Sequence, residues 1–288
     1  MKNTLLTAAL LAASSIFPGH AFADPKPLET QVFTASPNGF LVDSTLVTGD
    51  KDAMLIDAQF DRADAHRLVA QILEAKKNLT TVFITHSHPD HYFGLEVIHQ
   101  AFPKAKLVAL PATVAEIKKT WQGKVKQWQP MFGDSIASNP VLPTALSGTT
   151  LTLDGQTLEI HGGVQGDEAQ CAYVWIPSTK TVIAGDIVYR GVHVWTAETK
   201  APQRQAWKKT LDELAALHPT TVIAGHKDPR LDNSPAGIDQ TRQYLDAFDA
   251  AVASAKTSED AQAKVKAHFK DLQLDVILKI GADAQYAK

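Results

Sequence analysis

The sequence predicts an α/β protein in which two β-sheets pack face to face and helices cover their outer faces. Apolar segments typical of strands occur in both halves of the chain, bounded by turn residues. Segments with the period of amphipathic helices lie between these strands and after the last one. Such elements bury their apolar faces in an αββα sandwich, although periodicity alone does not give the order of the strands.

The composition is typical of a globular protein without a nucleic acid partner. The 288 residues are 44% hydrophobic and 20% charged, with a net charge of −3. No block of basic residues indicates binding to nucleic acid or to an anionic membrane surface. We therefore expect a small-molecule substrate as the partner, and the sequence leaves the oligomeric state open.

Residues 1–23 have the pattern of a secretory signal peptide. Lys2 supplies a positive charge, residues 5–17 form an apolar run, and Ala21-Phe22-Ala23 offers small residues for cleavage. The run is shorter than the roughly 20 apolar residues of a membrane anchor. We expect export to a bacterial periplasm, or secretion, with cleavage after Ala23. Residues 24–288 are expected to form a single domain.

The first half of the mature chain alternates strands and helices. Asn38-Gly39 and Gly49-Asp50 are turn signals on either side of the first strand. Residues 62–77 carry apolar side chains at helical spacing, and Pro111 opens a later helix. The predicted strands are residues 40–48, 53–57, 80–85 and 106–110. The predicted helices are residues 62–77, 92–101 and 112–128.

The second half follows an irregular connection, residues 131–148, which is expected to contribute to the walls of a pocket. Asp154-Gly155 is a turn between two of the later strands. The predicted strands are residues 149–153, 157–161, 172–176, 181–184 and 220–223. The predicted helices are residues 201–217, 235–253 and 258–269. The core is expected over about residues 31–229, followed by C-terminal helices within residues 235–270.

Four potential metal ligands lie within six residues at the end of the third strand, in His86-Ser87-His88-Pro89-Asp90-His91. Residues two apart in an extended strand point to the same side, so His86 and His88 can reach one point together. Pro89 helps to turn the chain because it cannot extend the ladder of hydrogen bonds. Asp90 and His91 then begin the next helix and can face a second point nearby. The arrangement suits two adjacent divalent cations.

This His-x-His-x-Asp-His pattern resembles the signature of the metallo-β-lactamase-fold superfamily, and the resemblance spans roughly residues 31–229. It implies an αββα sandwich of two mixed sheets. It also implies that His86 and His88 bind one metal and that Asp90 and His91 bind the second.

Two later strands end in the dipeptides that the resemblance requires. Residues 181–186 end in Gly-Asp, and residues 221–226 end in Gly-His. The resemblance implies that Asp186 bridges both metals, since each carboxylate oxygen can bind one cation. His226 completes the second site, and the glycine before each ligand allows close approach of the backbone.

The third motif departs from the superfamily pattern, because no histidine stands where the third ligand of the first site is expected. Asp167 follows a glycine at the corresponding distance before Asp186 and is the preferred replacement. Gln165 and an incomplete first site are the alternatives. His161 is placed near the site as a pocket or supporting residue. A carboxylate ligand makes iron or manganese more plausible at the first site, whereas zinc remains the default metal.

Several other residues receive roles from their position. By the resemblance, Asp57 supports the metal-binding loop through hydrogen bonds. Cys171, the only cysteine, lies in an apolar run and is interpreted as a small buried side chain rather than a ligand. Tyr189, His193 and Trp195 follow the ligand Asp186 in a segment that is expected to line the pocket.

The leading hypothesis is an exported metallo-hydrolase with two divalent ions. A metal-bound hydroxide would cleave an ester, lactone, thioester or β-lactam bond, with Asp90 carrying a proton to the leaving group. A mononuclear iron oxygenase of the persulfide-dioxygenase type is the first alternative. A metal-binding protein without turnover is the second.

Overall fold

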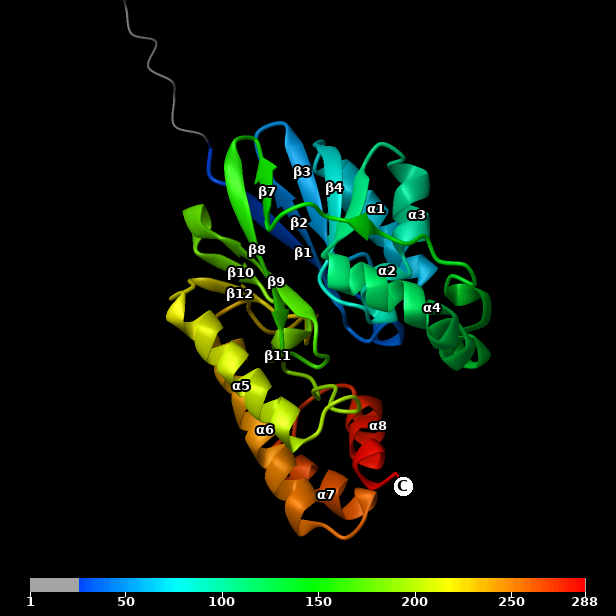
Figure 1. Ribbon diagram of the computed structural model, residues 1–288, viewed down its shortest axis with the longest axis vertical. Helices are drawn as coiled ribbons and strands as arrows, with labels where there is room; N and C mark the ends of the chain where they lie inside the picture. The colour runs from blue at the N-terminus through cyan, green and yellow to red at the C-terminus, as the bar shows by residue number, and fades with distance from the viewer. Residues whose placement is uncertain (1–25, 288) are drawn as a thin grey trace, which may run out of the picture.

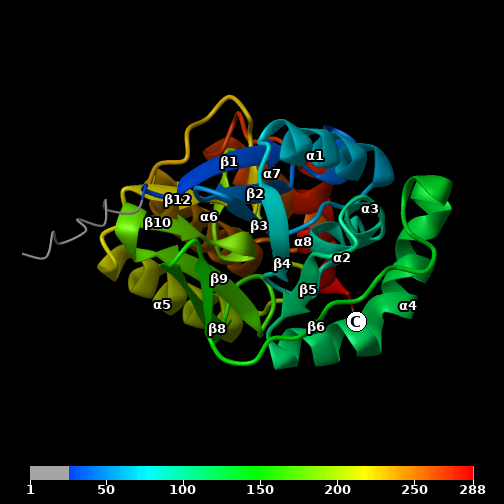
Figure 2. The same cartoon turned by 90° about the horizontal axis from the view of Figure 1, so that it is seen from above.

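The computed structural model describes residues 26–287, in which two β-sheets lie between two groups of helices (Figures 1 and 2). The predicted signal peptide, residues 1–23, lies outside the described residues. Within residues 26–287, no helix combines the length and apolar character needed to cross a membrane.

The first sheet is mixed and has six strands in the order β1-β2-β3-β4-β5-β6. The pairs from β1 to β3 are antiparallel, and the pairs from β3 to β6 are parallel. The strands are β1 (Glu29–Thr34), β2 (Asp43–Thr48), β3 (Asp52–Ile56), β4 (Asn78–Ile84), β5 (Lys106–Ala109) and β6 (Thr144–Ala145).

The second sheet is also mixed, with five strands in the order β12-β10-β9-β8-β7. β10 pairs parallel with β12 and antiparallel with β9, and the pairs from β7 to β9 are antiparallel. A short parallel pair, β11 and β13, lies apart from both sheets. The strands are β7 (Thr150–Leu153), β8 (Gln156–Val164), β9 (Cys171–Ile176), β10 (Thr181–Ile183), β11 (Tyr189–Arg190), β12 (Thr221–Ile223) and β13 (His226–Lys227).

Helices cover the outer face of each sheet (Figure 1). The first sheet carries α1 (Arg62–Glu74), α3 (Leu95–Ala101) and α4 (Pro111–Phe132). The second sheet carries α5 (Ala201–Ala216) and α6 (Ala236–Ser254). The short helix α2 (Pro89–Tyr92) follows β4, and α7 (Ser258–His268) and α8 (Asp275–Tyr286) follow α6.

The αββα layering follows from the alternation of side chains along the strands. In β3, Leu55 packs with the helices of the first layer, whereas Met54 and Ile56 face the second sheet. In β9, Trp175 packs with the helices of the second layer, whereas Val174 faces the first sheet. The predicted fold class is therefore confirmed, and most predicted elements are present with ends shifted by a few residues.

One predicted strand begins later than expected. Phe40 and Leu41, predicted to open the first strand, have φ angles of 59° and 54°, and β2 begins only at Asp43. The chain turns here because its carbonyl groups accept hydrogen bonds from the other half of the molecule. Phe40 O accepts a hydrogen bond from His226 Nδ1, and Leu41 O accepts one from the backbone N–H of Lys227.

The C-terminal region extends beyond the predicted helices. The prediction ended the helices at residue 270, but α8 begins at Asp275 after Leu274, which has a φ of 66°. The sequence did carry a signal, since Ile277, Leu278, Gly281 and Ala282 are buried at helical spacing.

Strand β1 was not predicted from the sequence. The connection over residues 131–148 is largely irregular as predicted, with β6 near its end.

The close contact between α3 and the loop after β3 can be tested with two glycines. A Cβ at Gly94 would lie 1.9 Å from the carbonyl oxygen of Ala58, whereas a Cβ at Gly123 in α4 would have no atom within 4 Å. We expect Gly94→Ala to lower the free energy of unfolding by about 1–3 kcal/mol. Gly123→Ala is expected to raise it by about 0.5–1 kcal/mol. Denaturant titration checks both, and equal effects of the two substitutions would contradict this packing.

Candidate metal centre

The structure brings all seven predicted ligand residues together in two adjacent groups. In each group, one ligand atom per residue lies within 4.8 Å of the others. The first group is His86, His88, Asp167 and Asp186, and the second is Asp90, His91 and His226.

The ends of strands from both sheets supply these side chains. β4 delivers His86 and His88, and the turn into α2 delivers Asp90 and His91. β10 and β12 of the second sheet lead to Asp186 and His226. A Cβ at Gly225 would lie 2.0 Å from Asp186 Oδ1, so only glycine permits this approach between the two later segments.

Asp186 lies between the two groups. Its Oδ1 is 3.1 Å from His91 Nε2, and its Oδ2 is 3.2 Å from His226 Nε2 and 3.7 Å from His86 Nε2. Burial would raise the pKa of Asp186, but the rings of His226 and His91 lower that pKa well below its ordinary value. An ionised carboxylate that lies between the groups, with Oδ2 near a histidine of each, is placed to act as the predicted bridge.

Hydrogen bonds to Asp57 fix the rings of His86 and His91. His91 Nδ1 donates to Asp57 Oδ2 at 2.8 Å. The Thr85 hydroxyl also donates to Asp57 Oδ2, at 2.8 Å, and its oxygen is therefore left to accept from His86 Nδ1 at 3.0 Å. In both rings Nε2 faces the centre, and the neutral form of each ring would carry its proton on Nδ1 and leave Nε2 free to bind a metal.

His226 and His88 are oriented by different partners. His226 Nδ1 donates to Phe40 O at 2.7 Å, so its Nε2 also faces the centre. In His88 the opposite nitrogen faces the centre, since Nδ1 lies 2.9 Å from Asp167 Oδ2. Its Nε2 lies 3.4 Å from Glu198 Oε1, which would favour a proton on Nε2.

The residues present fit metal ions. The Nε2 atoms of His86 and His91 and the Oδ1 atom of Asp186 are buried without a hydrogen-bond partner in the described residues. Buried polar atoms are normally paired, and imidazole and carboxylate groups bind zinc, iron and manganese. The buried cluster is compatible with a dinuclear metal site.

Asp167 occupies the place of the missing histidine. It is fully buried, and its Oδ2 lies 3.2 Å from the oxygen of the Tyr189 hydroxyl. Burial raises the pKa of the Asp167 carboxyl to about 7; the neighbouring His88 opposes this shift and Asp186 adds to it. A carboxylate in this position is stabilised by positive charge, which a bound cation would supply.

The other candidates near the third motif lie outside the cluster. The Gln165 side chain donates to the carbonyl of Gly166. The prediction that His161 is a pocket or supporting residue is wrong. Its ring stacks on Tyr173 at 4.7 Å, and its side chain is 39% exposed, because β8 directs it toward the outer face of the second sheet.

Cys171 is buried beside the first group and is not arranged as a nucleophile. Its Sγ lies 3.5 Å from Asp167 Oδ1. Burial and the nearby carboxylates of Asp167 and Glu168 raise the pKa of the Cys171 thiol well above its ordinary value. The thiol therefore stays neutral, in agreement with the prediction of an inert buried side chain.

Two glutamates beside the first group were not predicted from the sequence. Glu168 accepts hydrogen bonds from the backbone N–H and the hydroxyl of Ser87, at 2.8 and 2.6 Å, and so fastens the loop between the first two histidines. Glu198 pairs with Lys124 at 2.9 Å and faces His88. Neither position carried a recognisable signal, because both act from other loops across long sequence distances.

The family model of the metallo-beta-lactamase superfamily matches residues 37–226, more than half of the chain. The chain belongs to the metallo-beta-lactamase superfamily. This membership supports a metal-dependent, hydrolase-type role at the level of the superfamily, whose members are varied. No curated protein matches the chain.

Solved structures of superfamily members share the fold. A metallo-beta-lactamase family protein from Thermus thermophilus is 18% identical, with a TM-score of 0.62 over 90% of this chain and 92% of that chain. A metallo-beta-lactamase from Pontibacter korlensis is 18% identical, with a TM-score of 0.56 over 78% and 96%. The DIM-1 metallo-beta-lactamase is 19% identical, with a TM-score of 0.55 over 76% and 92%. At these identities the similarity shows the fold alone.

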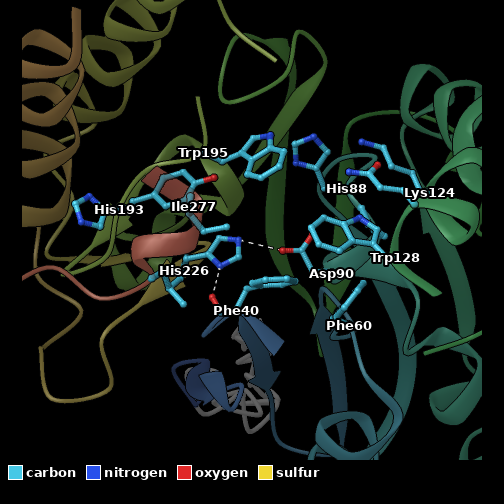
Figure 3. Close-up of a pocket in the computed structure, with 14 residues that line it drawn as sticks. Phe40, Phe60, His88, Asp90, Lys124, Trp128, His193, Trp195, His226 and Ile277 are labelled. Carbon is cyan, nitrogen blue, oxygen red and sulfur yellow. Dashed lines mark hydrogen bonds and ion pairs between the residues drawn. The ribbon is translucent and has the colours of Figure 1, made fainter. Parts of the chain in front are cut away.

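A pocket opens onto the second group of this superfamily centre. The side chains of Asp90 and His226 lie at its middle, and rings from both halves of the molecule surround them (Figure 3). Tyr189, His193 and Trp195 line it as predicted. The prediction that residues 131–148 form its walls is wrong, because α4 and the start of α8 occupy that position instead.

Removing the carboxylate that orients the rings is expected to weaken metal binding. Asp57→Ala leaves Thr85 and His91 without their shared acceptor, so we expect metal affinity to fall about 10- to 100-fold. Asp212→Ala is the matched control, since its carboxylate pairs with Arg242 at the surface and is 69% exposed. Competition with a chromophoric chelator measures both, and equal affinity of the two variants would show that the orientation is irrelevant.

The first group, with a carboxylate in place of a histidine, is expected to release its metal first. Increasing chelator should remove two equivalents of zinc in two steps. Asp167→Ala should retain about one equivalent, because the second group has no contribution from Asp167. Metal quantification after dialysis checks this, and equal resistance of the two equivalents to the chelator would contradict it.

Proposed function

We propose that this chain is an exported hydrolase that uses two divalent metal ions to cleave an ester, lactone, thioester or β-lactam bond. One observation carries the proposal. Buried, unpaired ligand atoms on His86, His91 and Asp186 converge beneath a pocket that opens beside Asp90. The predicted signal peptide supports export, with the periplasm or the outside of the cell as the site of action.

The reaction adds water to an acyl group. The water oxygen forms a bond to the carbonyl carbon, and the bond between that carbon and the leaving oxygen, nitrogen or sulfur breaks. The products are a carboxylic acid and an alcohol, amine or thiol. Bound divalent ions would supply Lewis acidity, which lowers the pKa of water and polarises a carbonyl group. His86, His88, Asp167 and Asp186 would hold one ion, and Asp90, His91, His226 and Asp186 the other.

Asp90 is placed to move the proton. Its Oδ2 lies 3.2 Å from His226 Nε2 at the middle of the pocket. Burial would raise the pKa of Asp90, but the rings of His91 and His226 lower that pKa below its ordinary value. The carboxylate is therefore ionised and can accept a proton from water and deliver it to the leaving group.

Tyr189 orders the carboxylates beneath the pocket. Its hydroxyl donates to Asp186 Oδ2 at 2.7 Å, and its ring stacks on that of His226 with centroids 5.3 Å apart. The stacking limits rotation of the His226 ring, so the ring keeps its Nε2 toward Asp90. Tyr189 thus couples the bridging carboxylate to the histidine of the second group.

The test begins with metal quantification on purified protein. A panel of lactone, β-lactam, thioester, ester and phosphoester substrates is then assayed. We expect about two divalent ions and turnover of at least one acyl substrate. Asp186→Ala should abolish turnover, and Asp90→Asn should lower kcat by about 100-fold or more while leaving the fold intact. Unchanged turnover in Asp186→Ala would overturn the proposal.

A second function is favoured by the donor set of the first group. Two histidines and the carboxylate of Asp167 are ligands that suit a single ferrous ion in an oxygenase. One equivalent of iron with uptake of molecular oxygen would support this function. Two equivalents of zinc without oxygen uptake would exclude it. Stoichiometric metal without turnover of any substrate would indicate a metal-binding protein.

A further inference from the structure

The pocket beside the candidate centre has apolar walls on several sides. Phe40, Phe60, Trp128 and Trp195 contribute aromatic rings, and Leu274 and Ile277 contribute aliphatic side chains. These rings lie above, below and beside the Asp90 carboxylate, and Ile277 lies on the side of His226 (Figure 3). A molecule whose reacting group reaches Asp90 would therefore place its remaining atoms against apolar surface.

The basic side chains around the pocket are already paired, whereas the buried Trp195 Nε1 has no hydrogen-bond partner among the described residues. Of the lysines and arginines in residues 26–287, Lys124 alone lines it, and its Nζ lies 2.9 Å from Glu198 Oε1. The buried His193 ring contacts the Tyr244 hydroxyl through Nδ1 and lies 3.3 Å from Asp275 through Nε2. Among the described residues, no unpaired lysine or arginine lines the pocket to receive an anionic substituent, and a charge buried without a partner is unfavourable.

Helix α8 completes the pocket and lies beyond residues 37–226, which the superfamily model matches. Ile277 is 7% exposed and points from α8 into the pocket. The segment before α8 pairs with the loop after Asp186, since His193 N donates to Gln273 O at 2.9 Å and Gln273 N donates to Gly191 O at 3.0 Å.

The far end of α8 is also fixed to that loop. Gln285 Nε2 donates to the carbonyl oxygens of Thr196 and Thr199, at 3.1 and 3.3 Å. Gly281 packs against Thr196, whose Oγ1 would lie 2.4 Å from a Cβ at that position. Hydrogen bonds at both ends therefore make α8 a fixed wall of the pocket.

We infer that the substrate is an uncharged ester or lactone that carries an apolar aliphatic or aryl group, and that Ile277 of α8 limits the length of this group. The inference rests on the proposed hydrolase function and narrows its substrate class. The apolar group packs between the aromatic rings and Ile277, and the acyl carbon lies at Asp90. The same walls disfavour substrates that bear a carboxylate, as common β-lactams do.

The kinetic test uses metal-loaded protein and p-nitrophenyl esters of increasing chain length. We expect kcat/KM to rise by roughly fourfold per added methylene until the chain fills the pocket. A neutral ester should be preferred at least tenfold over its carboxylate-bearing counterpart. No dependence on chain length, or preference for the anionic substrate, would overturn the inference.

Substitutions at two neighbouring positions of α8 test whether Ile277 limits the length of the substrate chain. Ile277→Phe should shorten the longest accepted chain, and Ile277→Ala should lengthen it. Val276→Phe is the matched control, because Val276 is adjacent on the same helix but 48% exposed. The length limit should be unchanged in Val276→Phe. An equal limit in all three variants would contradict the role of Ile277.

Binding of a neutral apolar fluorophore separates this inference from the proposed function. N-phenyl-1-naphthylamine should bind the wild-type protein and Val276→Phe, and binding to Ile277→Phe should fall at least tenfold. If no ester is hydrolysed but the fluorophore behaves in this way, the hydrolase function fails and the apolar pocket stands. If esters are hydrolysed but Ile277→Phe changes neither the length limit nor fluorophore binding, the function stands and the inference fails. Circular dichroism establishes that each variant is folded.

Discussion

The candidate centre depends on the buried carboxylate of Asp57. It accepts three hydrogen bonds, from the backbone N–H of Thr85, the Thr85 hydroxyl and His91 Nδ1. These bonds connect the end of β3 to the loop after β4. They also determine which ring nitrogen of His86 and His91 carries the proton. Because Asp57 is not itself aimed at the centre, its contribution is orientation. A loop with five polar residues in six would otherwise have many conformations, and ordering it would oppose metal binding.

The centre lies where the two halves of the molecule meet. The N–H of Asp43 donates to Gly225 O, the N–H of Ala172 donates to Thr85 O, and His226 Nδ1 donates to Phe40 O. Each bond joins a segment of the first half to one of the second. The apolar layer between the sheets sets the distance across this boundary. The ligands therefore share one position only when both sheets are complete, which explains why residues far apart in the sequence form a single site.

Much of this arrangement could be predicted from the sequence. The strand period places His86 and His88 together, and the apolar strands before Asp186 and His226 mark where those side chains emerge. Asp167 was preferred from its spacing before Asp186 and from the glycine that precedes it, and the structure places it within the first group. Longer-range features could not be read in this way. The turn at Phe40 exists because of a distant histidine, and Glu168 and Glu198 reach His88 from loops that carry no periodic pattern. Export, the identity of the metals and the substrate remain predictions, since backbone geometry does not determine them.

The unpaired nitrogen and oxygen atoms at the centre also have a thermodynamic consequence for folding. Each buried polar atom without a partner lowers stability by about 1–3 kcal/mol, and the Nε2 atoms of His86 and His91 and one oxygen of Asp186 are in this state. The unfolded chain would solvate them. An ion that binds only the folded arrangement removes this imbalance, so folding and metal occupancy are linked equilibria. For this protein, the concentration of free metal would act as a determinant of stability, and hence of resistance to proteolysis, as well as of activity.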